Sequence, residues 1–505
     1  MLRRVDRFVD RTTMYRLVLY YLLALAGGAF LLGMFRLIAV DPTALAFSAV
    51  LITGTCWLAN RVFAQVFGAV PNVESVYITA LILVLIVDPT TATDLTGVGL
   101  LLFASVWAMA SKYIFAARGR HIFNPAAIGV ALPGLLLGEP ASWWISTITW
   151  LLPVILVGGL LLVRKLRRFD LVLAFAVTNL LVGVLSAAPG EMLGQLRLTL
   201  MESPFFFFAF VMLTEPLTAP QQKAWRITYG ALVGLLASPQ VHVAGYYFTP
   251  EVALLAGNLL TFLVSAQGRV VLTLERIEKA AGDAYDFVFR PDRPLAFAAG
   301  QYLEWTLPVA RPDDRGNRRY FTIASAPSGE KVRLGVKFAA GASTFKQALA
   351  ELRPGQTVVA SQLAGDFTLP RDPGRKLAFI AGGIGMTPFR SMLEELLERN
   401  EPRPIVVLYG NASVNDIAYR DVLEEAERRL GIPTHHAVLD PEGAGPGVKR
   451  GFIDEAMIRR AVPDFAERTF YVSGPQPMVS AVRRTLRRMG VPFWRIRTDF
   501  FPGLA

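Results

Sequence analysis

Apolar residues in the first half of the chain fall in long runs, without a regular alternation of apolar and polar positions. Ten such runs lie between Met14 and Ser265, at residues 14–38, 43–60, 73–87, 95–115, 124–137, 143–163, 170–187, 204–214, 224–238 and 248–265. Runs near the ~20 residues that cross a bilayer predict membrane-spanning helices, and shorter or Pro/Gly-interrupted runs are typical of broken helices beside a site. We therefore expect an α-helical polytopic membrane domain over residues 1–265.

The second half shows two other patterns. Residues 268–370 contain short apolar stretches separated by turn residues, which predicts a small antiparallel β-barrel. Residues 375–505 alternate strands and amphipathic helices, which predicts an α/β domain with a parallel sheet. The expected elements are Lys376–Ala381, Thr387–Arg399, Ile405–Tyr409, Ala418–Leu430, Phe470–Val472 and Pro477–Met489. A parallel sheet binds its ligands beyond the carboxyl ends of its strands.

Composition agrees with this division and removes some classes of function. Of the 505 residues 53% are hydrophobic, and 29 of the first 265 residues are charged against 62 of the last 240. No surface interleaves basic and aromatic residues, so no nucleic-acid partner is expected. The single cysteine, Cys56, excludes an intrachain disulfide and an iron–sulfur cluster held by this chain alone. His121 and His242 are too few for a two-haem membrane core, and we expect no metal site.

Basic residues between the apolar runs predict the orientation. With ten spans, the loops on the side of both termini hold ten Lys and Arg, and the opposite loops hold only Arg36 and Arg197. This bias puts both termini in the cytoplasm, with the first domain in the lipid bilayer of a plasma or inner membrane. The N-terminal arginines precede no small-residue cleavage site, so a removed signal peptide is not expected.

The membrane half contains an internal repeat. Residues 88–92 (DPTTA) close the third run and residues 215–219 (EPLTA) close the eighth, 127 positions later. The same shift lays the other runs of the first five onto the last five. Because five spans is an odd number, the two halves must be inverted, and inverted repeats usually enclose a central site. An acidic residue before proline is also ordinary turn chemistry.

Two motifs in this half resemble a known family. Residues 119–127 (GRHIFNPAA) and 208–216 (FAFVMLTEP) are similar to membrane flavoproteins of the RnfD and NqrB type, which belong to the Rnf electron-transport complexes and to the sodium-translocating NADH:quinone reductase. The resemblance implies ten helices in a 5+5 inverted repeat and a bound flavin. The family's Ser/Thr-Gly-Ala-Thr motif for covalent flavin is absent, because the loop reads SAAPGEMLG at 186–194 and Thr199 is its only threonine. A covalently attached flavin is therefore not expected, and a non-covalent FMN or riboflavin in the membrane domain stays open.

Two glycine turns carry the chemistry of the second half. Residues 381–388 (AGGIGMTP) follow a buried strand and open a helix, and residues 471–478 (YVSGPQPM) repeat this arrangement about 90 positions later. Glycines let backbone N–H groups approach a pyrophosphate, and a helix N-terminus favours its charge. Either turn alone could be a tight connection. Together with residues 318–327 (RRYFTIASAP), 341–344 (GAST) and 499–501 (DFF), they resemble the ferredoxin–NADP reductase superfamily over residues ~268–505.

This second resemblance implies roles for individual residues. Arg319 would meet the FAD phosphates, Phe321 would lie against the isoalloxazine, and Thr322 would bond near flavin N5. The FAD pyrophosphate would be seated by Gly341, Ser343 and Thr344. The nicotinamide dinucleotide would be bound by Gly382, Gly383, Gly385, Thr387 and Pro388, with Gly474, Pro475 and Met478 on the far wall. Thr322, Ser473 and Asp499 are the expected catalytic residues, with Phe500 and Phe501 bordering the flavin.

This sequence departs from the superfamily pattern at two positions. Phe321 replaces a tyrosine, so stacking remains while a phenol hydrogen bond is lost, and Ser473 replaces a cysteine beside nicotinamide C4. The strand end at residues 409–416 (YGNASVND) has no basic residue to meet a 2′-phosphate, which favours NADH. Arg420 follows closely enough to keep NADPH open.

The two halves together predict a membrane flavin oxidoreductase. Cytoplasmic NAD(P)H would reduce FAD, and electrons would pass to a flavin in the membrane domain and then to a quinone or a trans-membrane acceptor. The alternative is an inverted-repeat transporter or channel whose reductase domain regulates it or supplies flavin. The sequence leaves the terminal acceptor, ion pumping and the oligomeric state open.

Overall fold

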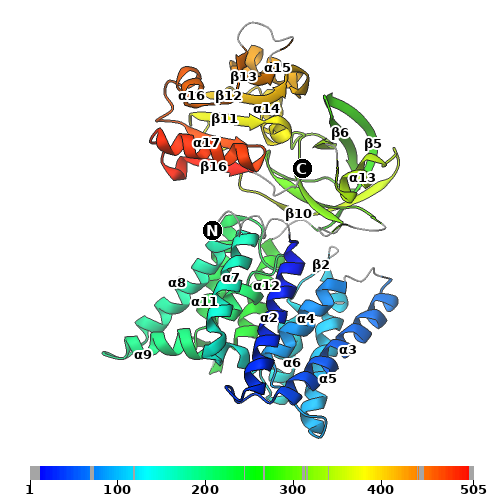
Figure 1. Ribbon diagram of the computed structural model, residues 1–505, viewed down its shortest axis with the longest axis vertical. Coiled ribbons are helices and arrows are strands. Elements are labelled where there is room, and N and C mark those ends of the chain that lie inside the picture. Colours follow the sequence, from blue (N-terminus) through cyan, green and yellow to red (C-terminus); the bar gives the residue numbers. More distant parts are fainter. Residues whose placement is uncertain are drawn as a thin grey trace. The chain divides into compact units, whose positions relative to one another are not determined.

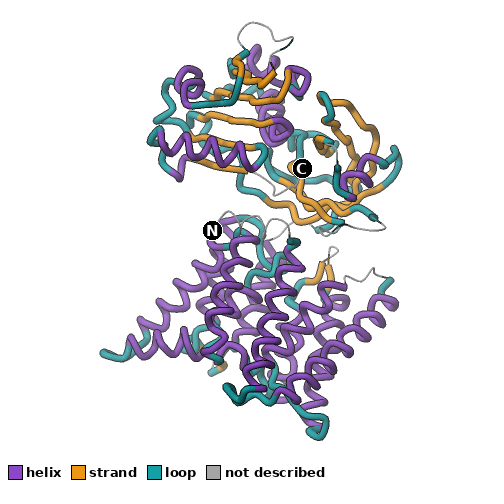
Figure 2. Tube along the Cα trace, in the orientation of Figure 1, coloured by secondary structure: helices purple, strands orange, loops and turns teal. Residues whose placement is uncertain are grey.

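The chain forms two compact units, Met1–Gly268 and Arg269–Ala505, here called unit 1 and unit 2 (Figure 1). The computed structural model describes residues 12–68, 73–117, 120–243, 245–264, 268–309, 313, 317–338, 341–440, 442 and 448–499. Unit 1 is helical apart from two hairpins of two-residue strands, and unit 2 contains both long sheets (Figure 2).

The helices of unit 1 follow the expected apolar runs. They are α2 Met14–Met34, α3 Pro42–Val66, α4 Val73–Ile86, α5 Leu95–Ile114, α6 Pro125–Leu137, α7 Leu152–Leu166, α8 Phe169–Leu185, α9 Met192–Arg197, α10 Phe205–Phe207, α11 Lys223–Leu236 and α12 Pro250–Val264. Residues Phe208–Met212 continue α10 as a π-helix. The hairpins pair β1 Ala116–Ala117 with β2 Arg120–His121, and β3 His242–Val243 with β4 Tyr246–Tyr247.

Local capping explains where several helices begin. The side chains of Thr13, Asp41 and Asn124 each accept a backbone N–H of the first turn of α2, α3 and α6. The run expected as a helix from residue 143 is an exception: two 3₁₀ turns precede α7, which begins only at Leu152. Trp143 has a φ of +53°, which an α-helix excludes, and Pro153 occupies the first turn of α7, where proline is tolerated.

Helix length does not support ten membrane crossings. Among the described residues, four segments are long and apolar enough to cross a membrane by length and composition: Met14–Met34, Pro42–Val66, Leu95–Ile114 and Thr149–Leu166. Shorter apolar helices occupy Glu74–Ile86, Pro125–Leu137, Phe169–Leu185 and Pro250–Val264. Unit 1 is thus a helical region with four candidate spans, and the expectation of ten is not met.

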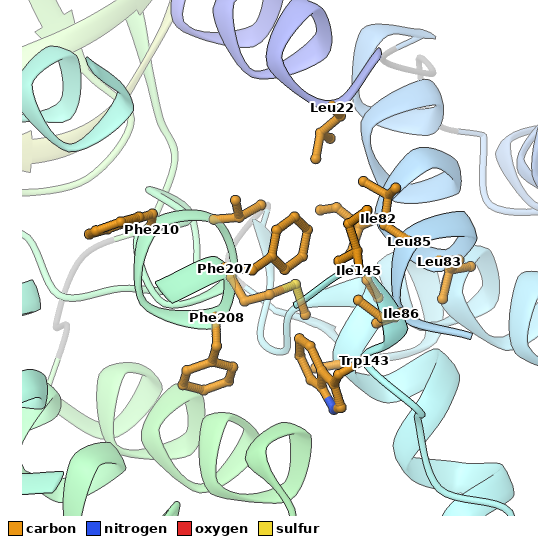
Figure 3. Packing of buried hydrophobic residues seen from close by; sticks show 14 of the residues in the cluster. Leu22, Ile82, Leu83, Leu85, Ile86, Trp143, Ile145, Phe207, Phe208 and Phe210 are labelled. Atoms are coloured by element: carbon orange, nitrogen blue, oxygen red, sulfur yellow. The ribbon is translucent and has the colours of Figure 1, made fainter. Parts of the chain in front are cut away.

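The core of unit 1 forms around α4 and the π-helix that follows α10. Figure 3 shows Phe207 pointing toward Ile82 and Ile145, with Trp143 packed nearby. Trp143 also makes an edge-to-face contact with Phe208, with ring centroids 5.8 Å apart. Residues 82–86 of α4 and Phe208–Met212 are buried throughout, so the core lies where the third and eighth apolar runs meet.

Unit 2 begins with an antiparallel sheet. Its strands are β5 Val270–Ala281, β6 Ala284–Pro291, β7 Tyr302–Thr306, β8 Arg318–Thr322, β9 Val332–Lys337 and β10 Thr357–Ala364, in the order β8-β7-β10-β5-β6-β9. The short helix α13, Thr344–Ala350, packs on its apolar interior through Phe345 and Leu349. The structure confirms the expected antiparallel β-barrel architecture.

A parallel sheet completes unit 2. The order β14-β13-β12-β11-β15-β16 joins Lys449–Arg450, Thr434–Asp440, Ile405–Ser413, Leu377–Gly382, Thr469–Ser473 and Ile496–Asp499. Its helices are α14 Thr387–Arg399, α15 Arg420–Leu430, α16 Glu455–Ala461 and α17 Gln476–Arg488. Sequence analysis missed β13, β16 and α16. Each is short or rich in polar residues, as in THHAVLD and IRTD, so hydrophobic periodicity is weak there.

Candidate functional site

Two expected catalytic residues lie side by side at the carboxyl edge of the parallel sheet. In register, Ser473 pairs with Ala381 of β11 on one side and with Asp499 of β16 on the other. Both polar side chains are buried. This is the strand edge at which open α/β sheets bind ligands.

The two glycine turns touch each other at this edge. A Cβ on Gly385 would lie 2.5 Å from the Cα of Gly474, and a Cβ on Gly382 would lie 2.1 Å from the Sδ of Met478. The backbone contact leaves no room for a side chain on Gly385, whereas a side chain on Gly382 would require the flexible Met478 side chain to shift. The structure therefore brings together the motifs at 381–388 and 471–478, about 90 residues apart in the chain.

A buried tyrosine holds the first turn in place. Residues Gly383–Met386 form a 3₁₀ turn that leads into α14, with Pro388 in the first turn of that helix. The Tyr409 hydroxyl donates to the Gly383 carbonyl at 3.1 Å and accepts the Ala418 N–H at 3.3 Å. Burial raises the pKa of Tyr409, so the hydroxyl stays neutral and keeps its proton to donate.

The turn also presents open space beside its backbone. Gly383 has a φ of +51°, a conformation that favours glycine, and a Cβ there would meet no atom within 4 Å. Thr387 is buried and its hydroxyl donates to the Ile384 carbonyl at 3.2 Å. The glycine turn has free space on one side and leads into a helix of 13 residues. Backbone N–H groups at such a helix N-terminus can bind a pyrophosphate group.

A second cluster lies on the barrel. Arg319 and Phe321 share one face of β8, and both pack on Phe345: the Arg319 guanidinium carbon lies 5.3 Å from the ring centroid and the Phe321 centroid 5.8 Å from it. The Ser343 hydroxyl caps α13 by accepting the Lys346 N–H at 3.4 Å. The expected FAD residues of β8 and of the 341–344 segment are thus brought together.

Asp313 ties this cluster together, while Thr322 lies on the opposite face. Asp313 binds the Arg319 guanidinium at 2.9 Å, and its backbone N–H donates to the Thr344 hydroxyl at 3.0 Å. Thr322 pairs with Tyr302 of β7 and is buried, with its side chain directed away from Arg319 and Phe321 by strand alternation. Gly341 has a φ of +78° and open space beside it.

Helix α14 joins the two clusters. The Arg390 guanidinium donates to the Ala324 carbonyl at 2.5 Å, and the Ser391 hydroxyl donates to the Ser325 carbonyl at 2.7 Å. Glu394 accepts the Ala326 N–H at 2.8 Å. The segment that follows Thr322 is therefore fixed to the helix whose first turn carries Thr387 and Pro388.

Sequence reasoning missed a buried network beside this helix. The Tyr419 hydroxyl donates to Asp286 at 2.6 Å, and the other oxygen of Asp286 binds Arg333 at 2.9 Å. Burial and the Asp286 charge raise the pKa of Tyr419. Tyr419 has a φ of +58°, and nothing in its sequence neighbourhood signals this conformation or its partner in the barrel.

The strand end expected near the adenosine ribose contains both acid and base. Partial burial acts to raise the pKa of Asp416, but hydrogen bonds from Lys337 and Ser413 outweigh it and hold that pKa below its usual range. Arg420 donates to the Val414 carbonyl at 2.7 Å, which places it at the same strand end. The geometry therefore keeps both NADH and NADPH open. Phe500 and Phe501 lie outside the described residues.

Unit 1 has its own cluster, built from the two motifs of the first resemblance. His121 Nε2 lies 3.3 Å from Glu215, and the Asn124 N–H donates to Asn258 at 2.8 Å. A cavity of about 60 Å³ is lined by residues of both motifs, among them Asn124, Pro125, Thr214 and Glu215.

Comparison with known proteins agrees with the geometry of unit 2. Residues 379–484 match the family model of the oxidoreductase NAD-binding domain. The reductase subunit of glycine betaine monooxygenase from Pseudomonas aeruginosa (strain UCBPP-PA14) is 27% identical over 249 residues, 48% of this chain and 67% of that protein. Flavohemoprotein of Pseudomonas putida is 29% identical over 282 residues, 55% of this chain and 67% of that protein.

Among solved structures, the cytochrome P450 reductase GcoB of Amycolatopsis aligns at 25% identity with a TM-score of 0.41, over 46% of this chain and 69% of that one. The expected enzyme class is confirmed: the chain is an NAD(P)H-dependent oxidoreductase that contains FAD. Its C-terminal part resembles the reductase modules of flavohemoproteins and oxygenases. The resemblance of unit 1 to the RnfD and NqrB type of membrane flavoprotein has no counterpart among these relatives.

Proposed function

We propose that this protein is a membrane-embedded flavin reductase that moves electrons from cytoplasmic NAD(P)H through FAD to a quinone or to an acceptor across the membrane. The observation that carries the proposal is the union, in one chain, of an oxidoreductase NAD-binding sheet and a helical unit with an apolar outer surface. Covalent fusion keeps the electron donor at the membrane at high effective concentration.

The outer surface of α8 supports embedding in a bilayer. Phe169, Leu173, Val177, Leu181 and Leu185 recur every fourth residue, and each is between 44% and 74% exposed. A stripe of large apolar side chains along 17 residues would be a liability in water, whereas in a bilayer it contacts lipid tails. The proposal puts both termini of such a domain in the cytoplasm, as the bias of basic residues in the loops favours.

The neighbours of the helices support an inverted repeat. Shifted by 127 residues, α3, α5 and α6 correspond to α8, α11 and α12. In the first half α3 packs on α5 and α5 on α6; in the second half α8 packs on α11 and α11 on α12. The proposal keeps the 5+5 architecture with half-length helices, which suits short segments such as α4 and the pair α10 and Phe208–Met212.

In unit 2 the glycine turns would hold the nicotinamide dinucleotide. The backbone of Gly382, Gly383 and Gly385 and the first turn of α14, with Thr387 and Pro388, would face its pyrophosphate. Gly474, Pro475 and Met478 would form the opposite wall, because Gly474 and Met478 already contact the first turn. Ser473 and Asp499 would border the nicotinamide ring from the strand edge.

On the barrel, Arg319 would pair with the FAD phosphates, Phe321 would lie against the ring system, and Thr322 would hydrogen-bond near its reactive nitrogen. Gly341, Ser343 and Thr344 would complete the phosphate seat, where open space lies beside Gly341. When bound, FAD accepts an electron pair as hydride and releases electrons one at a time. Phe500 and Phe501 keep their proposed place at the flavin edge.

The cavity of unit 1 does not fit a second flavin as it stands. Its volume of about 60 Å³ is far below the ~300 Å³ at the lower end of ligand pockets. The proposal therefore routes no electron transfer through this cavity, and reduction of an acceptor across the membrane would require a carrier, such as a non-covalent FMN or riboflavin, elsewhere in unit 1. The flavins released from the purified full chain can be separated into FAD and FMN or riboflavin. FMN or riboflavin in addition to FAD would show that unit 1 holds a second electron carrier.

Vesicles test the electron path. The full chain is inserted in sealed vesicles that enclose ferricyanide or contain a ubiquinone analogue, and NADH is added outside. Reduction of the enclosed acceptor or of the quinone at a rate above protein-free vesicles supports the proposal. If NADH oxidation with external ferricyanide is intact and neither acceptor in the vesicle is reduced, the membrane path is wrong, and the transporter with a regulatory reductase takes its place.

A further inference from the structure

Helix α17 ends in a cluster of positive charge that differs from the rest of unit 2. Arg483, Arg484, Arg487 and Arg488 are all exposed and surround one shallow surface hollow. The opposite face of the helix is buried through Val479, Val482 and Leu486. The four arginines therefore form one charged face, here called the arginine face.

Carboxylates do not neutralise this face. Elsewhere in unit 2, helical arginines pair with acids one turn away, as Arg390 does with Glu394, Arg399 with Glu395 and Arg459 with Glu455. Helix α17 contains no Asp or Glu, and among the described residues none of its four arginines is in an ion pair. A helix C-terminus favours nearby cations, but four unneutralised guanidinium groups repel one another unless an anion binds them.

Two exposed aromatic residues follow the arginine face in the chain. Phe493 and Trp494 are 65% and 68% exposed, pack edge-to-face on each other at 5.1 Å, and begin five residues after Arg488. Large aromatic side chains in water are costly, whereas at a membrane–water interface their apolar rings and the Trp N–H are both satisfied. A cluster of arginines followed closely in the chain by exposed Phe and Trp is the chemistry of surfaces that bind anionic lipid headgroups.

A short linker ties unit 2 to unit 1. Helix α12 ends at Val264 and β5 begins at Val270, so even a fully extended linker of five residues separates the two ends by at most about 22 Å. Because unit 1 is proposed to span the membrane, lipid headgroups are present at high local concentration, and a modest affinity suffices for docking.

We propose that the arginine face, with Phe493 and Trp494, docks unit 2 on the anionic phospholipid headgroups of the membrane. This inference rests on the proposed membrane location of unit 1. Guanidinium groups bind phosphate oxygens in paired hydrogen bonds, and the aromatic pair enters the headgroup layer. Docking would hold the reductase at the lipid surface rather than leave it free to tumble on its linker.

The test uses the full chain with one fluorescent label. Cys56 is buried, so Ala481→Cys, on the exposed side of α17, supplies a single reactive thiol for an environment-sensitive dye. The protein is placed in nanodiscs of phosphatidylcholine alone or with phosphatidylglycerol, each with headgroup-spin-labelled lipid as quencher. We expect quenching to be about fivefold stronger in the anionic discs and to fall toward the neutral value at high salt.

Variants separate charge from aromatic anchoring. R483Q/R484Q/R487Q/R488Q should abolish the dependence on anionic lipid, whereas R290Q/R399Q/R428Q/R459Q removes four exposed charges elsewhere and should retain it. F493S/W494S should weaken quenching in both lipids while the salt dependence remains. NADH–ferricyanide activity of each variant reports that unit 2 is folded.

The outcomes decide the docking proposal separately from the membrane proposal. Equal quenching in neutral and anionic discs, or a full response in the α17 quadruple variant, overturns docking; an acidic protein partner would then be the occupant of this face. Membrane insertion of unit 1 is tested separately, without the label, by alkaline carbonate extraction of the parent chain. An inserted chain should resist extraction. Extraction by carbonate overturns the proposed span, and with it the tether on which docking depends.

Discussion

Glycines allow close backbone contacts in both units, but with opposite consequences. In unit 1, a Cβ on Gly230 or Gly234 of α11 would lie 2.4 Å or 2.5 Å from a carbonyl oxygen of α8. In unit 2, a Cβ on Gly385 would lie 2.5 Å from Gly474. The first contact joins two apolar helices face to face, as small residues do in membrane bundles. The second joins two turns at a sheet edge, where the neighbouring Gly383 stays open.

This comparison teaches that distance alone does not separate a packing glycine from a binding glycine. What separates them is whether free space lies next to the contact. Around Gly230 and Gly234 the neighbours are the backbone and side chains of α8, so a larger residue costs stability. Around Gly385 the contact shapes the open turn at residues 382–388, here called the cradle. A larger residue there should weaken nucleotide binding before it affects stability.

The largest expected effect is at the cradle. Gly385→Trp should lower NADH oxidation about 100-fold or more, because the indole must displace the Gly474 turn and occupy the pyrophosphate site. FAD content, measured after acid release, should be unchanged. Gly329→Trp, at an exposed turn with no contact below 3.5 Å, is the control. Normal turnover in a folded Gly385→Trp protein would remove residues 382–388 from the site.

The second test is at the helix contact. Gly234→Ala should destabilise unit 1 by about 1–3 kcal/mol through overpacking against Phe175, and leave the NADH–ferricyanide rate per FAD unchanged. Thermal unfolding in detergent measures the shift. Gly54→Ala in α3, where a Cβ meets nothing within 4 Å, should be neutral or more stable by up to about 1 kcal/mol. Equal behaviour of the two variants would contradict the packing role.

A smaller effect on NADH oxidation is expected when the cradle loses the hydrogen bond from Tyr409 but no side chain is added to it. Tyr409→Phe removes the hydrogen bond to Gly383, worth about 1 kcal/mol, and should raise KM for NADH about fivefold with little change in kcat. Tyr471→Phe removes a comparable bond to the Thr368 carbonyl in the same sheet and should leave KM unaltered. Steady-state kinetics of both variants decide whether Tyr409 positions the turn.

The smallest effect concerns acid stability. Burial, aided by the charges of Arg420 and His435, lowers the pKa of His436 below its usual value. The unfolded chain then binds a proton at a higher pH than the folded one, so stability falls as pH drops below about 6.5. His436→Gln should reduce the loss of melting temperature between pH 7 and pH 5. An identical pH profile in this variant would show that His436 contributes nothing.

Features set by nearby residues were predictable from the sequence. The bounds of α14, Thr387–Arg399, agree with the expectation, because an apolar strand, a glycine turn and Pro388 determine its start. The two glycine turns were found because glycine has few alternatives at such places. The resemblance marked Ser473 and Asp499 as catalytic residues, but their pairing was not predicted, since strand register depends on residues far apart in the chain.

Other features depend on tertiary contacts that leave no mark in the sequence. Tyr409 reads as an ordinary residue of an apolar strand, and its bond to Gly383 exists only because β11 and β12 are neighbours. Helix α7 begins nine residues later than expected because Trp143 packs into the core, where its ring nitrogen donates to Glu251 at 3.2 Å. Periodicity alone reads residues 143–163 as one helix.

The Tyr419 network has a thermodynamic consequence for unit 2. Tyr419 and Arg390 bind the barrel at Asp286 and Ala324, so neither part can unfold without leaving a buried polar group of the other unsatisfied. The two parts should therefore melt in a single cooperative transition. Any ligand that binds only the native barrel then raises the melting temperature of the nucleotide sheet as well, by mass action.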